Sequence, residues 1–294
     1  MNNIKKLSLV CALLVSSSTM ASVSIADFDA SNHALAGSGS ANFNQFDLTV
    51  DGVDIHVSAW SDTRGSSPST DTPDTDNDPY IERAYDLDNY RNGWSVENLD
   101  ERSNNCGYSH SADNLGSDCN YQDYDFFLLE FSEAVTLSEA FYSWAYDEGS
   151  NYHDDTAALN QVSVVAIESA DIEGSTWGTI AGLTGTTSDW SQLHHDSQTG
   201  SGQVNYNHHY YSDIGSAGTG NAGNLAGVYS NVWLIGALNE VFGGTGLSGN
   251  DGMKLAGVKF STEPAAHDVP EPSSIVLFGL AIAGLFSSRR KKLS

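Results

Sequence analysis

Basic residues are scarce in this chain of 294 residues, which has 12 Lys and Arg against 38 Asp and Glu. Half of the basic residues lie near the two ends, so residues 27–268 hold six basic and 37 acidic residues, a net charge of about −31. A surface this acidic repels nucleic acid phosphates, which excludes DNA and RNA as partners. The same charge favours solubility and attracts divalent cations.

Cysteine is nearly absent, with three residues, and Cys11 lies in an apolar run close to the N-terminus. The other two, Cys106 and Cys119, are 13 residues apart and predict one disulfide in an exported protein. Closing a loop of this size stabilises a fold by about 3 kcal/mol on the chain-entropy account. Two zinc thiolates are the alternative, but only His110 lies near enough in sequence to join them.

Long hydrophobic runs are also absent. The apolar run near the C-terminus, 275–286, has 12 residues and would reach about 18 Å as a helix, against about 30 Å for a bilayer core. We expect a short hydrophobic helix that is held in the membrane briefly rather than as a permanent anchor. Four consecutive basic residues after it suit the cytoplasmic side of a membrane. They are Arg289, Arg290, Lys291 and Lys292.

The N-terminal segment, residues 1–26, has the three regions of a secretory signal peptide. Two lysines precede an apolar run over 7–15, and small residues follow that run. Cleavage is compatible with two sites, after Ala21 or after Ala26, and we favour the second, which makes Asp27 the first residue of the mature chain. We therefore expect export through the Sec machinery.

The clearest local pattern is a β-hairpin. The Asp-Gly dipeptide at 51–52 is a two-residue turn flanked by alternating apolar and polar residues. Pairing across this turn places Phe46 opposite Val57 on one face and Asp47 opposite His56 on the other. The histidine is therefore expected to be a surface partner rather than a metal ligand.

The rest of the body also alternates with a period of two. Further strands are predicted at 126–131, 136–144, 162–168, 229–236 and 254–260. No segment has the pattern of an amphipathic helix of 12 residues or more. Short strands separated by long Gly-, Asp- and Asn-rich loops predict an all-β body, a β-sandwich or jelly roll. We expect one extracellular domain, 27–268, between the signal peptide and a C-terminal tail at 269–294.

One acidic loop has the spacing of a calcium site. Asp74, Asp76 and Asp78 lie in the polar, proline-containing stretch 61–79. An EF-hand is excluded because Pro79 stands where that loop requires glycine. We favour a solvated acidic loop, with a looser calcium site as the alternative, so calcium is a candidate cofactor and no cofactor is firmly expected.

Two histidine pairs, 194–195 and 208–209, offer a second kind of metal ligand. A hairpin centred near 201–202 would place His194 opposite His209. Facing imidazoles could bind zinc, copper or nickel, although the two pairs would make at best two half-sites.

Other chemistry has little support. Six Trp and 13 Tyr could stack on sugars, although most are expected in the core or at its rim. The sequence has no G-x-S-x-G and no H-E-x-x-H motif. Among 37 carboxylates, suitably spaced acid pairs are expected by chance. We therefore expect no catalysis.

The C-terminal tail, "VPEPSSIVLFGLAIAGLFSSRRKK", resembles the PEP-CTERM sorting signal of Gram-negative bacteria. Pro270, Glu271 and Pro272 form the Pro-Glu-Pro motif, and the apolar run and the basic cluster follow in the expected order. The resemblance implies that an exosortase, a multi-pass membrane enzyme, recognises and removes the tail. It also implies that the body goes from the inner membrane to the cell surface or the extracellular matrix.

A weaker resemblance covers residues 48–168. The stretches "HSADN" at 110–114 and "YDFFLLEFSEAVTLSEAFYSWAYDE" at 124–148 are similar to a module of exosortase-dependent surface proteins. This similarity implies location and architecture but no activity.

Together these features predict an exosortase-processed surface or matrix protein, associated with exopolysaccharide or biofilm, without catalysis of its own. A glycan-binding module of the matrix is the alternative, and a secreted carbohydrate-active enzyme is third. Coplanar exposed aromatic side chains in a groove would favour glycan binding. Two carboxylates about 5–9 Å apart in a cleft would favour the enzyme.

Overall fold

The computed structural model describes ten segments of the chain. They are residues 22–28, 44–62, 80–90, 93–97, 111–114, 124–147, 160–195, 210–216, 223–244 and 251–263. All ten belong to one unit, Ser22–Glu263. A second unit, made of Met1–Ala21 and Pro264–Ser294, lies outside the described residues.

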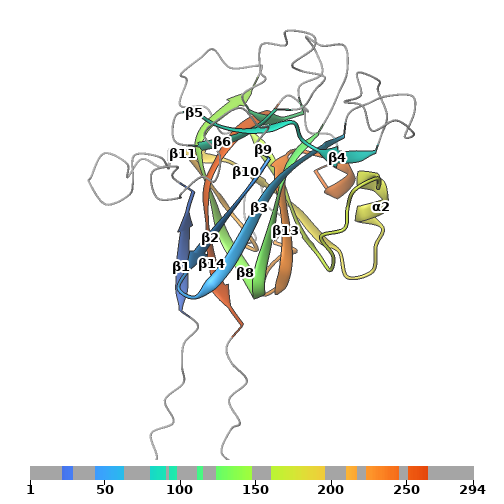
Figure 1. Ribbon diagram of the computed structural model, residues 1–294. Helices are drawn as coiled ribbons and strands as arrows, with labels where there is room; N and C mark the ends of the chain where they lie inside the picture. Colours follow the sequence, from blue (N-terminus) through green and yellow to red (C-terminus); the bar gives the residue numbers. More distant parts are fainter. Residues whose placement is uncertain are drawn as a thin grey trace, which may run out of the picture. The chain divides into compact units, whose positions relative to one another are not determined.

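Strands make up most of the described chain (Figure 1), which confirms the predicted all-β class. The strands are β1 Val23–Asp27, β2 Gln45–Val50, β3 Val53–Asp62, β4 Ile81–Arg83, β5 Asp86–Tyr90, β6 Gly93–Glu97, β7 Ala112–Asp113, β8 Asp125–Asp147, β9 Gln161–Ile167, β10 Thr187–Gln192, β11 His194–His195, β12 Tyr210–Asp213, β13 Ser230–Ala237 and β14 Asp251–Thr262. Two short helices accompany them, α2 Trp177–Ala181 and the 3₁₀ helix η3 Glu240–Phe242. No helix among the described residues is both long enough and apolar enough to cross a membrane.

The long strand β8 organises the sheet. Its first half pairs with β3 and β13, and its second half pairs with β12 and β14. The two halves meet at the exposed residues Ser132 and Glu133. All 14 strands thus belong to one hydrogen-bonded sheet, whereas the predicted β-sandwich has two separate sheets. The segments 126–131 and 136–144, predicted as two strands, are the two halves of this one strand.

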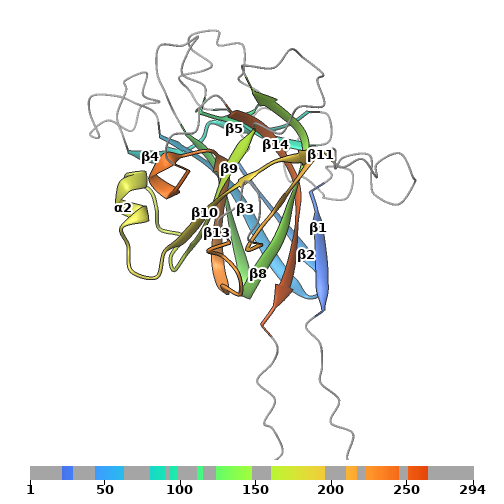
Figure 2. The same ribbon diagram turned by 180° about the vertical axis from the view of Figure 1, so that it is seen from behind.

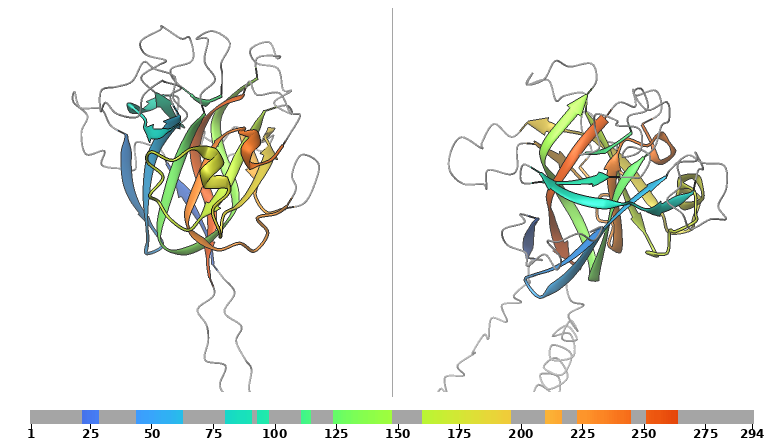
Figure 3. Two further views of the ribbon diagram at one scale, coloured as in Figure 1. Left: turned by 90° about the vertical axis from the view of Figure 1, so that its right-hand side faces the viewer. Right: turned by 45° about the horizontal axis from the view of Figure 1, so that its top comes forward.

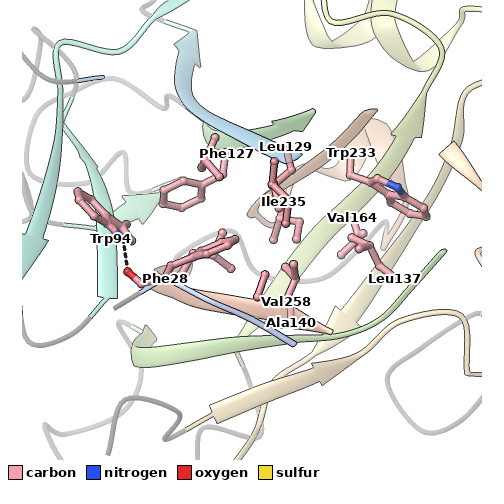
Figure 4. Close-up of a cluster of buried hydrophobic side chains, with 14 of the residues drawn as sticks. Phe28, Trp94, Phe127, Leu129, Leu137, Ala140, Val164, Trp233, Ile235 and Val258 are labelled. Atoms are coloured by element: carbon pink, nitrogen blue, oxygen red, sulfur yellow. Dashed lines mark hydrogen bonds between the residues drawn. The ribbon is translucent and has the colours of Figure 1, made fainter. Parts of the chain in front are cut away.

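The larger core lies between the strands around the first half of β8 and the strands around its second half (Figure 4). Phe127 and Leu129 enter it from the first half of β8, and Leu137 and Ala140 enter it from the second. Aromatic rings link the two sides: Phe131 and Phe260 have centroids 5.4 Å apart. Apolar side chains from both halves are therefore removed from water together, which is the main force that holds the halves against each other.

A second core covers the opposite face of the first half of β8. Phe126 and Leu128 point to this side, where Trp177 of α2 and Phe242 of η3 pack against the sheet. The rings of Phe126 and Trp177 are 4.5 Å apart between centroids. In the left view of Figure 3 both helices lie in front of the sheet, and Figure 2 shows α2 from behind. Burial on both faces explains why this half of β8 is continuously apolar rather than alternating.

The predicted hairpin is confirmed. Strands β2 and β3 pair with Phe46 opposite Val57 and Asp47 opposite His56. The turn residues have positive φ, 52° at Asp51 and 88° at Gly52, as a type I′ turn requires. His56 Nδ1 lies 2.6 Å from Asp47 Oδ1, so the histidine is a surface partner.

The first and last strands of this unit lie side by side. Strand β1 pairs with β14 in antiparallel register, from Val23 opposite Ser261 to Asp27 opposite Gly257. Val23 and Thr262 therefore lie at one end of the sheet, together with the β2–β3 turn, and we call this the terminal end. The opposite, distal end holds the last residue of β3, both ends of β8 and the first residue of β14 (Figure 1). These residues are Asp62, Asp125, Asp147 and Asp251.

Candidate functional site

Polar side chains are buried at the distal end, where several strands begin or end. Asn114, which follows β7, is completely buried. Its Nδ2 donates to the carbonyl oxygen of Leu238 at 2.6 Å, and its Oδ1 accepts from the backbone N of Asp251 at 2.7 Å. Its own backbone N donates to the carbonyl oxygen of Asp251 at 3.1 Å. This side chain therefore connects the segment after β13 to the start of β14.

Three carboxylates, those of Asp113, Asp125 and Asp251, are buried in the same region. Ser111 Oγ donates to Oδ2 of Asp113 at 2.6 Å, and the backbone N of Asp113 donates to Oδ2 of Asp125 at 3.2 Å. The backbone N of Gln161 donates to Oδ1 of Asp251 at 3.0 Å. Hydrogen bonds to a carboxylate offset the cost of burying its charge. The bonds hold the ends of β7, β8, β9 and β14 together.

This distal polar cluster has the chemistry of a structural connection. Within the ten described segments, no three Asp, Glu, His or Cys side chains are grouped so that they could hold a metal ion. Of the five hydrogen bonds described above that its side chains make, four are with backbone atoms. We therefore assign these residues to the joining of strand ends.

Asp113 and Asn114 lie in the stretch 110–114 that resembles the surface-protein module, but the sequence alone predicts no role for either residue. The same holds for Asp125 and Asp251. A local signal exists, since Asp125 directly precedes the apolar run 126–129 and Asp251 directly precedes the strand residues 252–262. Which strand ends these side chains join depends on partners far away in sequence.

His194 does not pair with His209 as predicted. Strands β11 and β12 do pair, but His194 lies opposite Tyr211, with ring centroids 5.4 Å apart. The predicted register, with His194 opposite His209, is therefore wrong by two residues. His208 and His209 lie outside the described residues.

Four of the six tryptophans lie in the cores. Trp60, Trp94, Trp177 and Trp233 are buried, at 3% exposure or less. The indole Nε1 of Trp94 donates to the carbonyl oxygen of Phe28 at 2.7 Å (Figure 4). Among the aromatic residues whose side chains the structure describes, most lie in the cores, as the sequence led us to expect.

Tyr142 is a titratable residue whose pKa is markedly shifted. Its side chain is completely buried, and its hydroxyl lies 3.0 Å from Ser212 Oγ. Burial raises the pKa of this phenol well above its ordinary value of 10, and the hydrogen bond with Ser212 lowers that pKa by a smaller amount. The group stays neutral at any physiological pH, so its role is structural.

The other candidate residues of the sequence lie outside the described residues. They are Asp74, Asp76 and Asp78 of the acidic loop, Cys106 and Cys119 of the predicted disulfide, Pro270, Glu271 and Pro272 of the sorting motif, and Arg289, Arg290, Lys291 and Lys292 of the basic cluster. The calcium site and the disulfide stay predictions. In the sequence, the acidic loop follows Asp62, and one cysteine lies on each side of β7.

Comparison with known proteins finds one match, in the C-terminal region. Residues 268–291 match the family model described as the PEP-CTERM protein-sorting motif. No curated protein and no solved structure matches the chain significantly. The motif implies an exosortase as the processing partner and export through the membrane to the cell surface. This chain therefore carries, at residues 268–291, the sorting motif of the PEP-CTERM proteins.

Proposed function

We propose that this protein is exported, that an exosortase removes its C-terminal tail, and that the body remains at the cell surface or in the extracellular polysaccharide matrix. The observation that carries the proposal is the PEP-CTERM match over residues 268–291. That segment contains the Pro-Glu-Pro motif at 270–272, the short apolar run and the basic cluster. The signal-peptide pattern at the N-terminus supports export through the Sec machinery.

The body itself acts as a structural or binding component, without catalysis of its own. Its buried carboxylates at the distal end accept hydrogen bonds that join strands. Four of its six tryptophans lie in the cores, which favours a structural role over glycan binding. We test for glycoside hydrolysis by incubating the purified exported protein with the polysaccharide of the producing cells. We expect no new reducing ends to appear.

The proposal is tested by replacing the charged residue of the sorting motif. Glu271 is the one charged residue between Asp268 and the basic cluster, so Glu271→Ala removes the feature that an enzyme could read by charge. We expect the variant to be exported but to keep its tail and to fractionate with the membrane. Intact mass spectrometry of the membrane, surface and matrix fractions measures both effects.

The matched control is Glu263→Ala, the same substitution at an exposed residue five positions before the motif. This variant should lose its tail and reach the surface as the wild type does. Normal tail removal in Glu271→Ala would show that the Pro-Glu-Pro motif is not read, and the proposal would then fail.

A further inference from the structure

Strand β1 lies between the two candidate signal-peptide cleavage sites. Cleavage after Ala26 would remove four of its five residues, whereas cleavage after Ala21 would keep the strand whole. We infer that signal peptidase cleaves after Ala21, so that the mature protein begins at Ser22 and keeps β1. This inference rests on the proposed export, and it reverses the preference for Ala26 that the sequence alone suggested.

The pairing of β1 is that of an integral strand. All five residues have a partner on β14, from Val23 opposite Ser261 to Asp27 opposite Gly257. Ser24 and Ala26 point inward, at 5% and 0% exposure, whereas Val23 and Ile25 point outward, at 58% and 53%. This alternation is the pattern of a half-buried strand.

Inward-facing side chains and the residue after β1 hold this strand against the β2–β3 turn and against β14. Ser24 Oγ donates to Asp51 Oδ2 at 2.7 Å, which links β1 to the β2–β3 turn. Directly after β1, the backbone N of Phe28 donates to the carbonyl oxygen of Ala256 at 2.9 Å. Ala26 and Phe28 both belong to the larger core at 0% exposure. A chain cut after Ala26 would lose the Ser24 contact and the buried Ala26 side chain.

The same cut would also place a charge at the last residue pair of the β1–β14 ladder. The new chain end would be the ammonium group of Asp27, which lies opposite Gly257 within the ladder. Placing a charged amine where a backbone N–H was is unfavourable unless the charge is solvated or paired. A terminus at Ser22 lies before the strand and has no such cost.

Strand β1 further protects an edge of β14. On one side β14 pairs with β8, and on the other side residues 257–261 pair with β1. Loss of β1 would leave the backbone groups of this edge without their strand partner. An open strand edge promotes association with other chains.

Gly257 fits a retained β1. A Cβ atom at this position would overlap the carbonyl oxygen of Ala26, so glycine lets the two backbones approach closely. The folded unit also begins at Ser22, the residue that follows Ala21. Both observations fit a mature chain that keeps β1 whole.

The first test is N-terminal sequencing and intact mass of the protein exported by its own host. We expect Ser22 as the first residue. Asp27 as the first residue would overturn the inference and leave the proposed export standing. A chain that still begins at Met1 would contradict export itself, and this inference would fall with it.

The second test uses the close approach at Gly257 in the full chain. Gly257→Ala should lower the melting temperature of the exported protein, because the new methyl group meets Ala26 of β1. The control is Gly252→Ala in the same strand, where a Cβ would make ordinary contacts of 3.4 Å with Asp113 and Ser111. Equal melting temperatures for the two variants would mean that β1 is not packed on β14, which overturns the inference.

Discussion

Tyr142 shows how one buried group makes stability depend on pH. Because burial raises its pKa in the folded state above the ordinary value of 10, its contribution to stability is complete below pH 10. That contribution is lost as the pH rises from 10 toward the folded-state pKa, since the unfolded chain then releases a proton that the folded chain keeps. Alkaline conditions therefore destabilise the fold through this residue.

Tyr142→Phe tests this effect. The variant loses the hydrogen bond to Ser212, so we expect about 1 kcal/mol less stability at neutral pH. Above pH 10 its free energy of unfolding should fall less steeply than that of the wild type, by up to about 1.4 kcal/mol per pH unit. Urea titrations at pH 8 and pH 11 measure both differences. Tyr229→Phe, at a side chain 37% exposed, is the control and should follow the wild type.

Asn114 is the residue on which the distal polar cluster depends most. Replacing it with Ala removes two side-chain hydrogen bonds and leaves the carbonyl oxygen of Leu238 and the backbone N of Asp251 without them. Buried groups that lose their partners cost about 1–3 kcal/mol each, so we expect a loss of about 2–4 kcal/mol. Chemical denaturation measures it.

The control for Asn114 is Asn231→Ala. Asn231 makes one side-chain hydrogen bond, to the carbonyl oxygen of Phe131 at 3.1 Å, from an exposed position. We expect this variant to lose about 1 kcal/mol or less. Equal losses in the two variants would contradict the assignment of Asn114 as the connecting residue.

At the scale of elements, the β2–β3 hairpin depends on its turn. Gly52 has φ of 88°, a conformation that a side chain disfavours, so Gly52→Ala should cost about 1 kcal/mol. Gly178→Ala is the same substitution inside helix α2, where there is room for a Cβ. That variant should be stabilised by about 0.5–1 kcal/mol. Thermal melts that show the same sign for both would contradict this account of the turn.

The predicted disulfide would close the chain segment that contains β7. We expect Cys106 and Cys119 to be joined in the exported protein, since the compartment is oxidising. After unfolding without a reductant, neither cysteine should react with a thiol-labelling reagent, whereas both should react after reduction. Labelling of both cysteines in the unreduced sample would show that the bond is absent.

At the scale of the whole molecule, the charge of about −31 on residues 27–268 opposes compaction. We propose that calcium offsets this repulsion at Asp74, Asp76 and Asp78. Binding linkage then adds about 1.4 kcal/mol of stability at tenfold saturation. Melting temperatures in calcium chloride should exceed those in sodium chloride of equal ionic strength.

The control for calcium is the triple variant in which Asp74, Asp76 and Asp78 are changed to Asn. It should melt at the same temperature in both salts, because only screening is left. Should the wild type also melt equally in the two salts, the acidic loop is a solvated surface and not a calcium site.

The sequence by itself determined the features that depend on near neighbours. The register of the β2–β3 hairpin follows from a two-residue turn and a period of two, both contained within 46–57. The sorting motif is also linear: its parts are recognised by their order over residues 268–291 without any fold. The all-β class follows from the same local alternation, repeated along the body.

Tertiary structure decided what depends on distant partners. Strand β8 is one continuous strand because it is hydrogen-bonded to β3 and β13 along its first half and to β14 along its second. The first half is also buried on both faces by the two cores, so its sequence lacks the alternation of apolar and polar residues that marks a half-buried strand. The pairing of β11 with β12 spans a segment too long for turn chemistry to set its register. Residues 23–26 read locally as the end of a signal peptide, because small residues suit a cleavage site. Their partner strand lies more than 200 residues later, so only the folded chain shows that they form an element of the sheet.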